Sequence, residues 1–418
     1  MTDKILSAIK AEGIEHFSLL AEREEREELY FVKKKLDMLR SVKKNSYTVT
    51  IFKDKTGSDG EQLRGSASVL VFDGMKDEEI RKKLRDGYGA CEYSLDRSYP
   101  LAKAEVFSPP ARSHTPAHTL AQDAARAVFS ADTHKSAYVC SCEIFVSHIS
   151  THIIGSQGTD VSFDKTRTWG ECVVTCKEEE DVELYDCFEL DGEDFSSLAP
   201  RISRLCKQAR DRSYAKKSLR SIDADLIIEG DAVRDTLGIF LWKTDAKNVH
   251  SGYSDIKTGD RICAGSLSLD AVATAPYDRE GVKMKDRTLI LGGTVASLWG
   301  STRYSSYIGA EATGEYSKIR AHGDCTPLAE MKKTPHLHVV SFSDFQADPL
   351  DGYIGGEIRL GYYFDGEKSV AVTGISVSAN VSALSDSAEM SEETYESAAY
   401  SGPLAIKIRG ASVSGCGL

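Results

Sequence analysis

The sequence lacks any run of apolar residues long enough to span a bilayer. Its first residues, MTDKILSAIKAEGIEHF, also lack the continuous apolar stretch and the small-residue cleavage site of a signal peptide. They predict a short amphipathic helix instead. We therefore expect a cytoplasmic protein with no membrane partner.

Positive charge is in the minority. Lys and Arg number 52 against 64 Asp and Glu, which gives a formal net charge of −12. Such a balance repels phosphate and disfavours nucleic acid as a partner over a broad surface. The basic cluster Lys33 to Lys35 could contact nucleic acid or lipid. Because Leu29, Phe31, Leu36 and Leu39 alternate around it, the pattern instead predicts two adjacent strands whose turn carries the lysines.

Several signatures of catalysis and cofactor binding are missing. The sequence contains no P-loop, no G-x-S-x-G elbow and no dinucleotide fingerprint followed by a helix. Its ten cysteines follow no zinc-ribbon or disulfide pattern, and several stand inside apolar segments. The sequence thus predicts no cofactor, and reduced, buried thiols of the kind found in the cytosol.

The chain is too long for one ordinary core. Alternating apolar positions and several helical segments predict an α+β protein in three parts. These are a small N-terminal α+β domain (1–108), a central mixed α/β domain (109–215) and a large, mostly antiparallel β domain (216–418). The proline-rich segment 107–118 is the candidate linker between the first two. Residues 385–402 are expected to form an acidic loop or short helix.

A helix entered from a strand is predicted for residues 230–245, GDAVRDTLGIFLWKTD. Val233, Leu237, Phe240 and Leu241 recur at helical spacing, so they are expected to form its buried face.

Two groups of metal-ligand residue types occur on predicted strands. His336 and His338, two positions apart, share one face and could share a metal ion, but no third ligand is visible nearby. Histidines that face solvent or form hydrogen bonds are the favoured interpretation. The second group, in VCSCEIFVSHISTHI (139–153), has no C-x-x-C spacing and is attributed to packing thiols and ordinary strand histidines.

The order of three further segments resembles the TldD/PmbA family, also called modulators of DNA gyrase. They are IIGSQGTDVSFDKTRTWGECVVT with its Ser-x-Gly turn, YDREGVKMKDRTLILGGTVASLWGS with its D-x-E-G motif, and DPLDGYIGGEIRLGYYFDGEK. The resemblance covers almost the whole chain. It implies the three-part fold described above.

The resemblance implies that the TldD-like branch of this family carries a His-Glu-x-x-x-His helix and a late Cys. The histidines and the Cys would hold zinc, and the Glu would activate a metal-bound water. The PmbA/TldE-like branch shares the fold without these ligands. Here Arg234 and Asp235 fall where the first His and the Glu would be, and Ile239 falls where the second His would be. Arg stays protonated and Ile has no lone pair. No His lies between residues 153 and 249, and Cys416 is too near the chain end to replace the late Cys. We expect no catalytic residue and no metal.

The resemblance implies a non-catalytic, bacterial-type PmbA/TldE-like subunit. Its partner would be a TldD-like metallopeptidase, and its substrates peptides or unfolded proteins. A homodimer is a further possibility. Two alternatives stay open: an independent hydrolase that uses His336, His338 or the cysteines, and a homo-oligomeric peptide-binding scaffold.

Overall fold

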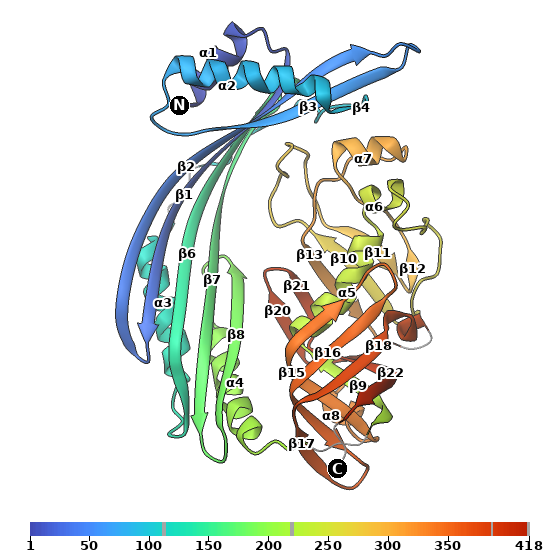
Figure 1. Ribbon diagram of the computed structural model, residues 1–418. Coiled ribbons are helices and arrows are strands. Elements are labelled where there is room, and N and C mark those ends of the chain that lie inside the picture. The colour runs from blue at the N-terminus through green and yellow to red at the C-terminus, as the bar shows by residue number, and fades with distance from the viewer. Residues whose placement is uncertain (111–113, 218–220, 386–387, 416–418) are drawn as a thin grey trace.

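The computed structural model describes residues 1–110, 114–217, 221–385 and 388–415. A long curved sheet stands beside a β-rich C-terminal body, and helix α4 lies on the side of the sheet that faces this body (Figure 1). The fold is α+β, as predicted. Within the described ranges, no helix is long and apolar enough to cross a membrane.

The long sheet contains eight strands, in the order β4-β3-β2-β1-β6-β7-β5, with β8 paired to β7. Their bounds are β1 (His16–Val32), β2 (Lys35–Thr56), β3 (Gln62–Val71), β4 (Leu95–Arg97), β5 (Val106–Phe107), β6 (Ala137–Gly155), β7 (Asp160–Lys177) and β8 (Asp181–Asp191).

Strands β1 and β2 are the two adjacent strands that the sequence predicts, and each is continuous. Their charged middle stays in the sheet because opposite charges face each other across the strands. Glu24 pairs with Lys44 and Glu25 with Lys43 in the register of the two strands. The predicted turn is confirmed at Lys33, which adopts a left-handed φ of 54°.

Two pairs of helices cover opposite ends of this sheet, each over its own hydrophobic core. They are α1 (Thr2–Ala11) with α2 (Asp77–Ala90), and α3 (Ala117–Ser130) with α4 (Leu198–Ser213). The two cores share one sheet, because β1 pairs with β6 from Ser18 to Val32, across the predicted boundary at residue 108. The domain boundaries at 108 and 215 stay a prediction.

The C-terminal part contains two further sheets, β12-β11-β10-β13-β21-β20 and β14-β19-β22-β18-β16-β15-β9. The strands of the first are β10 (Leu267–Val272), β11 (Arg287–Leu291), β12 (Thr294–Val295), β13 (Lys318–Gly323), β20 (Thr394–Ser397) and β21 (Tyr400–Pro403). Those of the second are β9 (Ile222–Glu229), β14 (Cys325–Thr326), β15 (His336–Ala347), β16 (Tyr353–Phe364), β18 (Ile375–Asn380), β19 (Glu389–Ser391) and β22 (Ala405–Ser414), and β17 (Ser369–Val372) pairs with β16.

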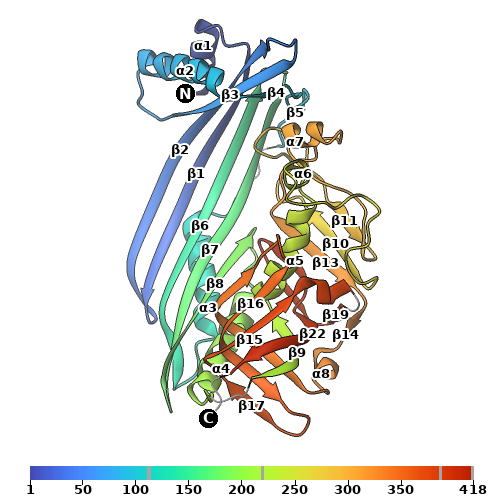
Figure 2. The ribbon, with the colours of Figure 1, turned by 45° about the vertical axis from the view of Figure 1, so that its right-hand side comes forward.

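Helix α5 (Asp231–Lys243) packs against the core of this C-terminal part (Figure 2). Val233, Leu237 and Phe240 are buried as predicted, whereas Leu241 is half-buried. The remaining helices are the short segments α6 (Ala246–His250), α7 (Thr302–Tyr307) and α8 (Leu328–Met331).

The prediction of an acidic loop or short helix for segment 385–402 is wrong. Apart from residues 386–387, which lie outside the described ranges, it contains the short strands β19 and β20 and the start of β21 instead of an acidic loop or helix. Met390 and Tyr400 are fully buried. Burial of these large apolar side chains outweighs the helix-compatible charge pattern between them.

The thiols of Cys142 and Cys172 face each other across β6 and β7, with the two Sγ atoms 3.1 Å apart and both residues 1% exposed. Their mutual hydrogen bond and their burial raise the pKa of Cys172. We therefore expect a thiol reagent to label the exposed Cys325 in the native protein and Cys172 only after unfolding. Mass spectrometry of labelled peptides measures this, and rapid native labelling of Cys172 would contradict it.

Candidate functional site

The cleft beside helix α5 is the candidate functional site. Strand β9 ends at Glu229, and Gly230 turns the chain into the helix with φ 63°, a conformation that favours glycine. The cleft has a volume of about 270 Å³ and is lined by Asp231 and Asp235 of α5, Arg201 of α4 and Tyr395 of β20.

Arg201 is the central cation of this cleft. Its guanidinium donates to both carboxylate oxygens of Asp186, at 2.5 and 2.7 Å, and to the Tyr395 hydroxyl at 2.9 Å. The Tyr395 hydroxyl in turn donates to Asp231 at 3.0 Å. Burial opposes the charge of Arg201, but the Asp186 carboxylate raises its pKa above the usual value. The arrangement is a bidentate ion pair that extends to α5 through a tyrosine.

A second guanidinium lies on α5 itself. Arg234 donates to Asp231 at 3.0 Å and to Asp235 at 2.8 Å. Burial again opposes the charge, and the hydrogen bond to Asp235 raises the pKa of Arg234. Both cleft carboxylates of α5 are therefore engaged by arginine.

The structure brings together two of the three predicted motif positions. Asp235 lines the cleft, and Arg234 contacts its carboxylate; both side chains are half-exposed. Ile239 is 2% exposed and belongs to the hydrophobic core of the C-terminal part. It therefore does not line the cleft with Asp235.

The side chains present in the cleft do not fit a zinc ion. Asp231 and Asp235 are the nearest carboxylates on the helix, and each already contacts a guanidinium. A divalent cation placed there would face the charges of both Arg201 and Arg234. Among the described residues, no three His, Cys, Asp or Glu side chains are grouped so as to hold a metal. Cys416 lies outside the described residues.

Sequence reasoning missed four residues of the cleft: Asp186, Arg201, Asp231 and Tyr395. Asp231 could have been found, because it stands four positions before Asp235 and so shares its helix face. Tyr395 lies in the segment that the sequence predicted as an acidic loop. No local sequence pattern marks Asp186 or Arg201, because only the tertiary fold brings them close to α5.

The two strand histidines are buried and hydrogen-bonded. His338 Nε2 lies 2.6 Å from Glu229 Oε1, and His336 Nδ1 donates to the Thr334 carbonyl at 2.7 Å. This confirms hydrogen-bonded histidines as the favoured interpretation. Burial lowers the pKa of His336.

The Cys and His residues of 139–153 lie along the unbroken strand β6. His148 contacts Thr166 Oγ1 at 2.9 Å, and His152 contacts Asp160 at 2.7 Å. Cys142 precedes His148 by six residues, or about 20 Å of strand. These side chains therefore do not converge on one site.

The D-x-E-G motif joins the C-terminal part to the long sheet. The Asp278 carboxylate accepts backbone N–H groups of Glu280 at 2.9 Å and Val282 at 2.8 Å. Gly281 has φ +87°, and a Cβ there would lie 2.8 Å from the side chain of Thr159, in the turn between β6 and β7 of the long sheet. The motif thus forms a tight turn in which only glycine allows the close approach.

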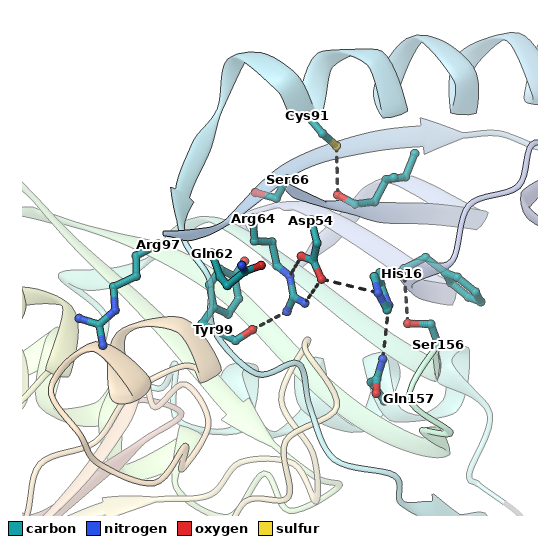
Figure 3. A network of polar contacts seen from close by, with 12 residues as sticks. His16, Asp54, Gln62, Arg64, Ser66, Cys91, Arg97, Tyr99, Ser156 and Gln157 are labelled. Atoms are coloured by element: carbon teal, nitrogen blue, oxygen red, sulfur yellow. Dashed lines mark hydrogen bonds and ion pairs between the residues drawn. The ribbon is translucent and has the colours of Figure 1, made fainter. Parts of the chain in front are cut away.

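The Ser-x-Gly turn lies at the same junction (Figure 3). Ser156 Oγ accepts the backbone N–H of Phe17 at 3.1 Å. Gln157 Nε2 lies 3.5 Å from His16 Nδ1, and His16 Nε2 lies 3.7 Å from the Asp54 carboxylate. This turn therefore connects β6 to the start of β1 and to β2.

Asp54 continues the network to Arg64, which donates to both its carboxylate oxygens at 2.6 and 2.8 Å and also to the Tyr99 carbonyl (Figure 3). These hydrogen bonds hold the pKa of Asp54 below its usual range, although partial burial opposes the shift. Both motifs therefore have a structural role at this junction.

Asp278 predicts a pH dependence of stability. One of its oxygens is buried with no partner among the described residues. Burial and the nearby Glu280 charge raise its pKa from 3.8 to about 7. Between these values the folded state keeps a proton that the unfolded state loses, so stability falls as pH rises. Relative to Asp278→Asn, the wild type should lose about 2 kcal/mol of unfolding free energy or more from pH 4 to 8. Urea unfolding across that range measures it, and parallel profiles would contradict it.

Comparisons with known proteins agree with this architecture. Residues 221–415 match the sequence profile of the PmbA/TldA metallopeptidase C-terminal domain. This match covers the C-terminal part of the chain and falls in the family that the sequence resembles, which supports the resemblance drawn from the sequence. No curated protein matches the chain.

Three solved structures share the fold over nearly the full length. TldE from Thermococcus kodakarensis has a TM-score of 0.75 at 14% identity, over 99% of this chain and 100% of that one. A protein described as a modulator of a DNA gyrase from Thermotoga maritima has a TM-score of 0.79 at 13% identity, over 99% of each chain. Another so described, from Bacteroides thetaiotaomicron, has a TM-score of 0.76 at 13% identity, over 99% of this chain and 98% of that one.

Proposed function

We propose that this chain is a metal-less, PmbA/TldE-like subunit that pairs with a TldD-like metallopeptidase in the proteolysis or maturation of peptides and unfolded proteins in the cytoplasm. The observation that carries the proposal is the cleft of α5, where Arg201 and Arg234 engage the carboxylates that a metal would need. The chain then supplies binding surface, and its partner supplies the metal and the activated water.

An unpaired strand edge supports pairing with another chain. Strand β3 pairs with β2 only from Tyr47 to Thr56, so the segment 35–46 of β2 has β1 as its only neighbour in the sheet among the described residues. Exposed apolar side chains gather on this hairpin: Val32 (56%), Leu36 (43%), Met38 (47%) and Leu39 (52%). An open edge with apolar side chains favours association with another polypeptide.

A TldD-like chain is a suitable partner for this edge, because it shares the fold and would present a similar hairpin. Two such hairpins can associate about an approximate two-fold axis, in which each chain uses the same surface. Backbone groups of β2 then find partners, and the apolar side chains leave water.

Co-expression tests the proposal. We expect the chain and the TldD-like protein of the same host to purify as a stoichiometric complex, measured by light scattering during size exclusion. The complex should cleave an unstructured peptide, and this chain alone should not. The variant Leu36→Glu/Leu39→Glu should abolish the complex, because it places two charges in the contact.

Leu291→Glu is the matched control, since Leu291 is also an exposed leucine (63%) but lies in the C-terminal part. It should leave the complex intact. Absence of a complex with the wild-type chain would overturn the proposal. A stable homodimer without peptidase activity would then support the scaffold, and hydrolysis by the isolated chain that is lost in His338→Ala would support an independent hydrolase.

A further inference from the structure

A second cavity, of about 510 Å³, lies between helix α4 and the C-terminal sheet that contains β15, β16 and β17. Figure 1 shows α4 beside this sheet, at the junction of the two halves of the molecule. Cavities at such junctions are common places for small-molecule ligands. The pairing proposed above does not use this cavity.

Aromatic rings form one wall. The His336 ring packs against Phe364 with centroids 5.6 Å apart, and the His338 ring against Tyr362 with centroids 6.0 Å apart. All four belong to the neighbouring strands β15 and β16. Tyr362 and Phe364 are the more exposed of the four, and a flat ring can stack on them.

Three cations border the same space: Arg204 and Lys207 from α4, and Lys332, which follows α8. Lys207 is paired with Asp211 at 2.8 Å. Within the described ranges, the side chains of Arg204 and Lys332 form no hydrogen bond or ion pair. Burial lowers the pKa of Lys332, which indicates that water stabilises its charge poorly.

The carboxylates nearby are already engaged. Glu229 contacts His338 at 2.6 Å, and Asp211 accepts the Tyr362 hydroxyl at 2.6 Å in addition to Lys207. Burial opposes the charge of Glu229, but the His338 hydrogen bond and the charges of Lys332 and Arg204 hold its pKa below the usual range. Among the described residues, Arg204 and Lys332 thus border the cavity without a direct ion pair to a carboxylate.

We propose that this cavity binds a small organic anion in which a phosphate or carboxylate group is attached to a flat ring. Arg204 and Lys332 bind the anionic group from opposite elements, and the ring stacks on the wall formed by β15 and β16. A neutral ring would leave the cations without a counterion, and a bare anion would leave the aromatic wall without a stacking partner.

Calorimetric titration of the full chain tests this with four probes: phenyl phosphate, benzoate, phenol and inorganic phosphate. At least one of the two ring-bearing anions should bind about tenfold tighter than phenol and inorganic phosphate, because it uses charge and stacking together. Preference for phenyl phosphate over benzoate identifies the anionic group.

Lys332→Gln should weaken that binding about tenfold. Lys333→Gln is the matched control, since the adjacent Lys333 is 67% exposed and paired with Glu330 at 2.6 Å. It should bind as the wild type does. If Lys332→Gln fails to fold, Arg204→Gln at an exposed helix position replaces it. The proposal is overturned if neither ring-bearing anion binds tighter than phenol, or if the control weakens binding as much as the pocket variant.

Discussion

Arg201→Met is expected to lower the free energy of unfolding by about 3 kcal/mol, because it removes one partner of a largely buried ion pair. The Arg201 side chain is 16% exposed and that of Asp186 is 22% exposed. Methionine keeps the length of the side chain but leaves Asp186 and the Tyr395 hydroxyl without their donor. Urea unfolding followed by far-UV circular dichroism measures the loss.

Arg204→Met is the matched control. Arg204 stands one turn further along α4, is exposed and forms no ion pair among the described residues. Its replacement should change the unfolding free energy by no more than about 0.5 kcal/mol. Arg201→Lys should recover only part of the loss, since an ammonium cannot bind both Asp186 oxygens in the bidentate geometry. Equal losses of unfolding free energy for Arg201→Met and Arg204→Met would show that the ion pair of Arg201 does not stabilise the fold more than an exposed arginine does.

The same network shows why the cleft was only partly predictable. Helix α5 and strand β9 follow from periodicity, which depends on residues close in the sequence. Arg201 and Asp186 reach α5 only through the packing of α4 and β8 against the C-terminal part. Their contact depends on the tertiary fold, and no local pattern encodes it.

The error in the predicted secondary structure of segment 385–402 has a similar origin. This segment carries five acidic residues and no basic one, but burial of Met390 and Tyr400 decides its structure. The sequence predicted the fold class well because it depends on many strand and helix signals, whereas the site depends on a few long-range contacts.

Ile239→His is the second change with a large expected effect. It restores the residue type that the family resemblance implies at this position, yet it should lower the unfolding free energy by about 3 kcal/mol. The imidazole would replace a side chain that is 2% exposed in the largest hydrophobic core, where it gains no partner from the cleft. Ile239→Val, which only shortens the apolar side chain, should cost about 1 kcal/mol.

The triple variant Arg234→His/Asp235→Glu/Ile239→His extends this argument to metal binding. In this structure the side chain at position 239 lies in the core, whereas that at position 234 is half-exposed, so the imidazole at 239 would have to leave the core to reach an ion in the cleft. Arg201 would still place its charge in the cleft. Elemental analysis after dialysis against zinc should therefore find no stoichiometric metal in the folded variant. One tightly bound zinc per chain would mean that α5 can rearrange to face both positions to the cleft, and the assignment of Ile239 to the core alone would be wrong.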